Sequence, residues 1–432
     1  MEVPLEGVLR RAALLAVAFA TAAVLISQAG KLWLASHRVD SDKPDVVEQG
    51  AALVPGNADA WDRLGRLRQW DMGNADATQA IAAYQNAVRA NPLSAHYWMD
   101  LASVYEAAGD DASARDAFAR ANAVYPASAE VAFYYGNFLL RRQEYPAAYQ
   151  ELYRAVRTDP TLLPLAISRA WRANGDVNAL LDRMLPANGD AYLQALEFFA
   201  SIRQTEPALV VWQRLVKLGK PIVLSRTFPF LEELIGEDRA DDACRVWKEA
   251  LAAAGMPSQE PANGSLIWNG NFKEDFAEGG LDWRWNTPLG VSIDFDNAPA
   301  PNQSRAIRLD FGGGNNLQLD APFQYVPVEP GRNYHFRAYL RTAEITTESG
   351  MRFQITDPHH AGAVNILTEG FTGTRPWTVV DADVAAGPET HFLVVRLVRL
   401  PSRLFENKLS GTSWVADVSL VPSSPAEERP SR

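Results

Sequence analysis

Two hydrophobic patterns divide the chain, one helical and one alternating. Over residues 46–255, apolar side chains recur at the three- and four-residue steps of amphipathic helices. Over residues 265–422 they alternate with polar ones in short runs, which is the pattern of half-buried strands. We therefore expect a multidomain protein in which an all-α helical repeat array precedes an all-β antiparallel sandwich. Residues 256–264, rich in Pro and Gly, are assigned to a linker, and residues 423–432 to a disordered tail.

An uncharged apolar run, residues 12–29, stands before both patterns. Its length is just sufficient for a transmembrane helix. Arg10 and Arg11 precede it, so the positive-inside rule keeps residues 1–11 in the cytoplasm and places the bulk of the chain on the periplasmic or other extracytoplasmic side. A cleaved signal peptide, which would make the protein secreted, and a buried globular helix are the alternatives. A polar linker, residues 30–45, follows the run.

Prolines mark a regular period in the helical array. Pro92, Pro126 and Pro160 recur every 34 residues, and each interval carries the signals of two helices separated by a turn. The middle unit shows the apolar positions of both helices: Trp98, Leu101, Ala102 and Tyr105, then Ala114, Phe118 and Ala121. This pattern resembles the tetratricopeptide repeat (TPR), clearly over residues 57–160 and in degenerate form to about 255, which makes roughly six helix pairs. The resemblance implies a protein partner bound by the repeats.

The alternating region contains about ten predicted strands. Its apolar positions form four clear runs: Ile307, Leu309 and Phe311; Tyr334, Phe336, Ala338 and Leu340; Phe353 and Ile355; Leu393, Val395 and Leu397. Turns rich in Gly, Pro and Asn separate the runs, as at residues 312–316 and 329–332. So many short strands in one segment indicate an antiparallel sandwich of the jelly-roll type.

The ends of this region resemble a family of glycan-binding domains. The segment opens with Asn-Gly-Asn-Phe, ending at Phe272, and closes on the strand around Trp414. These motifs are similar to jelly-roll carbohydrate-binding modules with a galactose-binding-like fold, which implies that the sandwich binds polysaccharide. In that family a glutamate after the opening Phe and an acidic residue in the last strand help to hold a structural calcium. Lys273 replaces the glutamate here, whereas Asp417 matches the acidic position, so Asp417 is the one candidate ligand of a possible calcium and no other cofactor is expected.

Sugar binding in such a domain needs an aromatic surface for stacking and polar groups that bond hydroxyls. The candidate residues are four aromatic side chains and three amides: Trp285, Tyr325, Tyr339, Trp377, Asn286, Gln324 and Gln354. Packing in the core is the alternative for each aromatic residue, because Trp and Tyr are well buried on average. Trp283 and Trp414 are assigned to packing.

Composition and charge exclude other functions. A net charge of −11 and a pI of about 5.2 leave no basic face for nucleic acid. Cys244 is the single cysteine and cannot form an intramolecular disulfide. None of the six histidines has an HExxH context or a Cys or His partner at ligand spacing, and His359 and His360 are interpreted as an exposed turn. Because no catalytic motif occurs, we expect no enzyme activity and assign no catalytic residue.

Together these features predict a membrane-anchored, non-catalytic scaffold on the bacterial envelope. Its repeats would bind a protein partner and its sandwich a glycan, as in exopolysaccharide or cell-surface polysaccharide assembly. In the alternative, the protein is a protein-only assembly platform whose sandwich is structural or protein-binding. A glycan-active enzyme that uses the sandwich for targeting would require two carboxylates that meet in a cleft.

Overall fold

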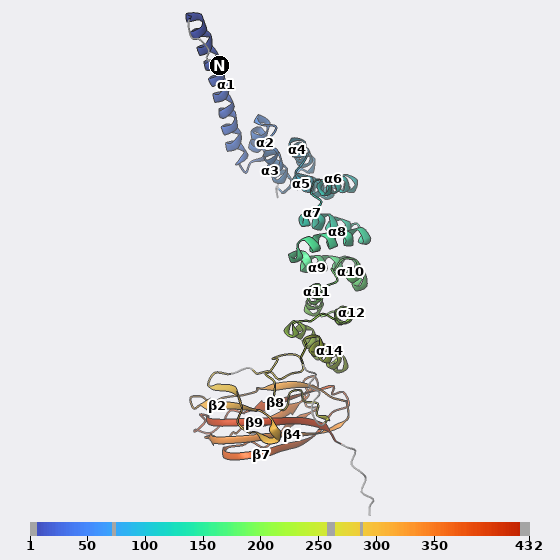
Figure 1. The fold of residues 1–432 in the computed structure, drawn as a ribbon, viewed down its shortest axis with the longest axis vertical. Coiled ribbons are helices and arrows are strands. Elements are labelled where there is room, and N and C mark those ends of the chain that lie inside the picture. The colour runs from blue at the N-terminus through green and yellow to red at the C-terminus, as the bar shows by residue number, and fades with distance from the viewer. Residues whose placement is uncertain (1–6, 71–74, 257–263, 286–287, 424–432) are drawn as a thin grey trace, which may run out of the picture. The chain divides into compact units, whose positions relative to one another are not determined.

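The computed structural model describes residues 7–70, 75–256, 264–285 and 288–423. The chain forms two compact units, Met1–Pro186 and Ala187–Arg432. The first is helical, and the second contains four helices and a β-sandwich (Figure 1). The predicted order of apolar helix, helical repeats and antiparallel sheets is therefore confirmed. Residues 257–263 of the predicted linker and all but the first residue of the predicted tail, residue 423, lie outside the described part of the chain.

The first helix, α1 (Val8–Val39), is the only described helix that is long and apolar enough to cross a membrane. Its most apolar stretch is 0% buried within the protein. The helix continues through residues 30–39, which the sequence pattern assigned to a linker, because good helix formers follow Gly30. Its last turn is part of the first folded unit, since Ala35 is buried and packs beside Gly50 of α2 (Pro44–Leu53).

Four helix pairs complete the first unit. They are α3 (Ala58–Trp70) with α4 (Ala77–Ala90), α5 (Ala95–Ala107) with α6 (Asp111–Val124), α7 (Ala129–Arg141) with α8 (Tyr145–Thr158), and α9 (Leu163–Asn174) with α10 (Val177–Arg183). A small residue on the first helix allows the close approach of the second. A Cβ atom at Gly65 would lie 2.6 Å from the ring of Tyr84, and one at Gly136 would lie 2.9 Å from Leu152.

Equivalent repeat positions make equivalent contacts. The indole of Trp61 donates to the carbonyl of Pro55 at 3.0 Å, and that of Trp98 donates to the carbonyl of Pro92 at 2.9 Å. Aspartates cap three of the second helices, because Asp76, Asp110 and Asp176 accept the backbone N–H of Gln79, Ser113 and Ala179. The sequence period therefore corresponds to a repeated three-dimensional unit.

The second unit begins with α11 (Gly189–Ser201), α12 (Thr205–Lys217), α13 (Phe228–Gly236) and α14 (Ala240–Ala253). Trp212 on α12 and Trp247 on α14 are both almost fully buried. They occupy the same place in their helices, each four residues after a buried alanine, as the degenerate repeat pattern predicted.

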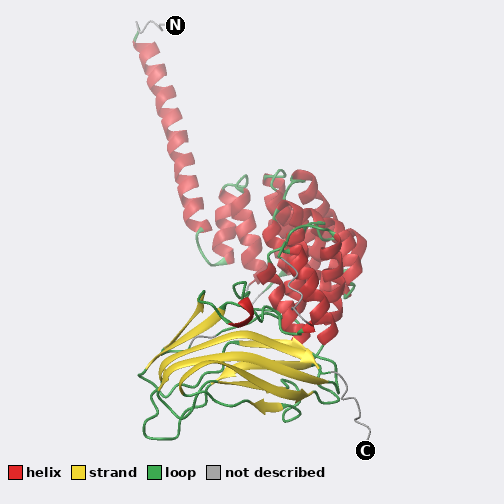
Figure 2. Ribbon diagram, turned by 60° about the horizontal axis from the view of Figure 1, so that its bottom comes forward, coloured by secondary structure: helices red, strands yellow, loops and turns green. Residues whose placement is uncertain are grey.

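The sandwich consists of two antiparallel sheets, drawn in yellow in Figure 2. Nine strands are described, where the sequence predicted about ten: β1 (Val291–Asp296), β2 (Ala306–Gly312), β3 (Phe323–Pro327), β4 (Asn333–Ile345), β5 (Arg352–Thr356), β6 (Asn365–Leu367), β7 (Gly373–Ala385), β8 (Phe392–Val398) and β9 (Ser410–Pro422). The five-stranded sheet has the order β1-β2-β9-β4-β7, and the four-stranded sheet has the order β3-β8-β5-β6. The inward-facing residues of both sheets form one core. Within it, the rings of Phe336 on β4 and Phe353 on β5 lie 5.0 Å apart.

Helices α13 and α14 pack directly on the sandwich. Gly279 packs against the ring of Phe228, and Gly280 packs against the ring of Trp247. A Cβ atom added at Gly279 would lie 2.2 Å from the Phe228 ring, and one added at Gly280 would lie 2.5 Å from the Trp247 ring. Trp247 also meets Trp268 edge to face at 6.3 Å. An apolar joint therefore connects the last two helices to the sandwich, which explains why all four helices belong to the second unit.

Candidate functional site

The outer face of the five-stranded sheet collects aromatic and arginine side chains. Leu340 and Val415 point into the core, so their strand neighbours Arg341 and Trp414 point outward. The Arg341 guanidinium carbon lies 4.4 Å from the centre of the Trp414 ring, and that of Arg308 lies 5.8 Å from it. Three adjacent strands thus place one indole ring between two cations.

A hydrogen bond holds the Trp414 ring in place, and only one of the two neighbouring arginines, Arg308, forms an ion pair with a described residue. The Trp414 indole donates to Asp296 at 2.8 Å. The backbone N–H of Ala298 and this indole together lower the pKa of Asp296 below its ordinary value. Arg308 is paired with Asp310 at 2.9 Å, whereas Arg341 makes no ion pair with a described residue. The face therefore offers a held aromatic ring beside a guanidinium that makes no ion pair within the described residues.

Two of the predicted sugar-binding residues lie on this same face. Tyr339 of β4 is half-buried and pairs with Val379 of β7, which is 41% exposed. Trp377 is also half-buried, and it lies in the bulge of β7 opposite Arg341, between the partners of Leu340 and Thr342. We call Arg308, Tyr339, Arg341, Trp377 and Trp414 the aromatic face.

Two other candidates lie on the outer face of the opposite, four-stranded sheet. Tyr325 and Gln354 are half-buried there. The guanidinium of Arg284 sits 5.0 Å from the Tyr325 ring and is paired with Glu232 of α13 at 2.5 Å. Gln354 donates to Asn365 at 3.1 Å. Because α14 also contacts β3, helices occupy part of this face.

The remaining candidates do not share either surface. The ring of Trp285 packs 4.8 Å from that of Phe276, and its indole donates to Glu278. Gln324 is fully buried, and its amide bonds the backbone N–H and carbonyl of Trp268 at 3.0 and 2.9 Å. Asn286 lies outside the described residues. Of the six predicted residues that the structure describes, Tyr339 and Trp377 lie on one outer face, Tyr325 and Gln354 lie on the other, and Trp285 and Gln324 lie on neither.

Asp417 is the predicted ligand of a structural calcium ion. Asp417 is half-buried on β9, and its carboxylate accepts a hydrogen bond from the side chain of Asn302. Near the opening of the domain, the carbonyl oxygen of Phe272 already accepts a bond of 2.6 Å from Arg305, and Lys273 is exposed. Calcium requires six to eight oxygen ligands. The described donors do not fit the ion, so we assign it no role.

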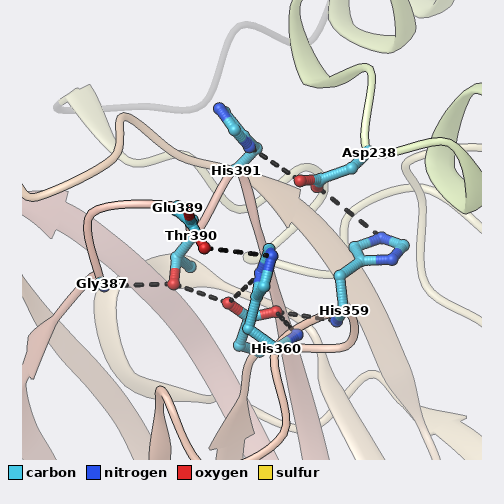
Figure 3. Close-up of polar contacts among 8 residues, drawn as sticks. Asp238, His359, His360, Gly387, Glu389, Thr390 and His391 are labelled. Carbon is cyan, nitrogen blue, oxygen red and sulfur yellow. Dashed lines mark hydrogen bonds and ion pairs between the residues drawn. The ribbon is translucent and has the colours of Figure 1, made fainter.

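A second polar group joins the sandwich to the α13–α14 turn (Figure 3). Asp238 in that turn accepts from Nδ1 of His391 at 2.8 Å, and its other oxygen lies 3.8 Å from Nε2 of His359. The sequence pattern treated His359 as part of an exposed turn, but the structure shows it half-buried against the helical turn. Non-local packing, which periodicity cannot report, makes this difference.

Asp357 orders the loop that carries His359 and His360. Its carboxylate accepts the backbone N–H groups of His359 and His360, each at 2.8 Å, and the hydroxyl of Thr390 at 2.6 Å. Burial opposes ionisation of Asp357, but these bonds outweigh burial and lower its pKa. The arrangement orders the loop.

Sequence reasoning missed the central residue of the aromatic face. Trp414 was assigned to packing, yet it is half-buried on the outer surface, whereas Trp283 is fully buried as expected. A signal was present in the sequence, because Val415 and Leu420 are apolar and alternation about Val415 turns Trp414 outward. The bulge near Asp417, which has a φ of 49°, obscures that alternation along the rest of the strand.

Parts of the chain are similar to known proteins. Residues 95–138 match the tetratricopeptide repeat family model, and no curated protein matches the chain. Many solved structures are similar to parts of it, among them the following three. The pilF protein of Pseudomonas aeruginosa is 22% identical, with a TM-score of 0.25, over 44% of this chain and 88% of that one. A structure described as CBM4 is 15% identical, with a TM-score of 0.27, over 36% of this chain and 99% of that one.

The third is the enzymatically active domain of tailspike protein 4 from bacteriophage CBA120. It is 15% identical, with a TM-score of 0.28, over 37% of this chain, which spans 22% of the tailspike's length. Scores this low assign neither a ligand nor a site. The chain combines tetratricopeptide repeats with a C-terminal antiparallel β-sandwich.

Proposed function

We propose that this protein is a non-catalytic, membrane-anchored scaffold whose β-sandwich binds a glycan through the aromatic face and whose repeats bind a protein partner. The observation that carries the glycan assignment is the position of Trp414, held by Asp296 and flanked by Arg341 on an exposed sheet. A pyranose ring stacks on a fixed aromatic surface, and a guanidinium donates several hydrogen bonds to neighbouring hydroxyls. Tyr339 and Trp377 extend the surface along β4 and β7.

The membrane and envelope assignments rest on α1 and its flanks. The unburied apolar run of α1, which follows Arg10 and Arg11, fits a single span with residues 1–11 in the cytoplasm. The bulk of the chain would then face a polysaccharide-containing compartment. A signal peptide satisfies the same pattern, in which case the protein is secreted.

The repeats offer a groove for a protein segment. Helices α2, α3 and α4 line a cavity of about 460 Å³ that contains Glu48, Trp61, Arg68, Gln79 and Asn86. Its charged and amide groups surround one indole, which suits an extended polar peptide. Tetratricopeptide repeats typically bind protein segments, so a protein partner is the expected occupant.

Glycan binding is tested with the full-length protein in detergent against a panel of bacterial polysaccharides. We expect saturable binding that weakens about two- to tenfold in Trp414→Ala and in Trp377→Ala, since one stacking contact contributes about 0.5–1.5 kcal/mol. Trp70→Ala is the matched control, because Trp70 is 71% exposed on α3 of the first unit. Equal binding by all three variants would remove the aromatic face as the binding site.

A protein-only assembly platform is the second candidate function. It is favoured by the packing of Trp285 against Phe276 and by the helices that occupy part of the four-stranded sheet. If no polysaccharide binds the folded protein, the sandwich is structural or protein-binding, and the partner should be sought through the repeats.

A further inference from the structure

Three potential metal ligands meet between the first two clear repeats. His96 and Asp100 lie one helical turn apart on α5, and Asp62 faces them from α3. One ligand atom from each residue lies within 4.8 Å of the other two. Nε2 of His96 and Oδ2 of Asp100 are 3.5 Å apart, close to the roughly 3–3.5 Å that separates two ligands on one ion at about 2.1 Å.

The buried carboxylate oxygens of this group have too few partners. Asp62 is 1% exposed, and its Oδ1 atom has no hydrogen-bond partner among the described residues. The same holds for Oδ2 of Asp100. The Asp62 Oδ2 atom is paired with Arg66 at 2.7 Å, so Asp62 has one oxygen engaged and the other unused. Two facing carboxylates with unused buried oxygens are costly unless a cation or a shared proton lies between them.

We propose that Asp62, His96 and Asp100 bind one divalent transition-metal ion, with zinc as the best match. One imidazole nitrogen and two carboxylate oxygens form a donor set that suits Zn²⁺ or a neighbouring first-row ion better than Ca²⁺ or Mg²⁺, which prefer oxygen alone. His96 is 52% exposed in its side chain, which gives the ion a path from solvent. Arg66 keeps its bond to Asp62 and orients that carboxylate from outside the coordination sphere.

A bound ion would connect two successive repeats. Trp61 and Trp98 occupy equivalent positions on the first helices of two successive repeats. Asp62 lies one residue after Trp61 and Asp100 two residues after Trp98, so the ligands come from neighbouring parts of these two helices. Binding to the folded state alone stabilises it by mass action. The ion therefore acts as a cross-link between α3 and α5 at the membrane-proximal end of the repeats.

The test is calorimetric titration of the metal-stripped, full-length protein in detergent with Zn²⁺ alone, supported by the absorption spectrum of the Co²⁺ form. We expect one ion per chain in the wild type and at least a tenfold weaker affinity in Asp62→Asn and in His96→Gln. His391→Gln is the matched control, because it removes a histidine that contacts a carboxylate elsewhere, at Asp238. The control should bind zinc like the wild type.

The other outcomes overturn the proposal. Absence of stoichiometric zinc binding in the folded wild type does so, as does binding that survives both ligand substitutions. Loss of binding in His391→Gln alone would place the ion at the sandwich instead. Melting temperature is the second measurement, since zinc should raise that of the wild type and leave that of His96→Gln unchanged.

Discussion

The joint between the helices and the sandwich can be tested by adding one methyl group at Gly280. This residue has a φ of 60°, and a Cβ atom there would lie 2.5 Å from the Trp247 ring. Gly331 is the matched control, because it has a φ of 72° in a sandwich turn and nothing lies within 4 Å of the position that a Cβ atom would take there. Both alanine variants share the backbone strain, and only Gly280→Ala also overpacks the joint.

The expected magnitudes follow from these two contributions. A left-handed backbone costs an alanine about 1–2 kcal/mol, which is the full effect expected for Gly331→Ala. Overpacking a tight contact adds about 1–3 kcal/mol for Gly280→Ala. In a folded unit of this size 1 kcal/mol lowers the melting temperature by about 2–4 °C, so Gly280→Ala should melt about 2–12 °C below the control.

The assay is thermal unfolding of both variants, followed by hydrogen exchange measured by mass spectrometry. In Gly280→Ala, exchange should accelerate together in α14 and β3, which are in contact. In Gly331→Ala it should accelerate only near the β3–β4 turn. Equal melting temperatures in the two variants, or exchange in α14 unchanged from the wild type, would show that the helices and the sandwich do not share this joint.

Three further predictions concern the sandwich. Gln324→Ala should lower the free energy of unfolding, measured with denaturant, by about 2–4 kcal/mol, because the backbone of Trp268 loses two buried hydrogen bonds. Because Gln324 is buried, the same variant should leave glycan affinity unchanged. Burial raises the pKa of Asp282 to about 6, so the folded state retains a proton that the unfolded state has lost. Stability should therefore fall as pH rises from about 4 to 6, and Asp282→Asn should flatten that fall; an unchanged slope would refute the assignment. Adding calcium or a chelator should not shift the melting temperature, since the donors near Asp417 do not fit the ion, and a rise with calcium would contradict this.

The strength of the local signals explains how far sequence reasoning reached. The 34-residue period carries helix caps, turn residues and helix-packing glycines in the same register, so the TPR units follow from chemistry within each unit. The four clear strand runs match β2, β4, β5 and β8, because alternation about a buried core is also local. The placement of single aromatic residues does not follow from local signals, since Trp414 was assigned to packing and lies on the outer face, whereas Trp285 was a candidate ligand and packs on Phe276.

The sequence by itself determined the kinds of elements and their order: an apolar helix, repeated helix pairs and alternating strands. Each of these elements depends on the spacing of apolar and polar residues along the chain, which can be read directly from the sequence. Tertiary structure alone decided that Trp414 and Arg341 meet across strands, that Gln324 is enclosed, and that Asp62 faces His96 from another repeat. These contacts join residues far apart in the sequence, and their geometry depends on strand order, a β-bulge and helix packing, none of which hydrophobic periodicity specifies.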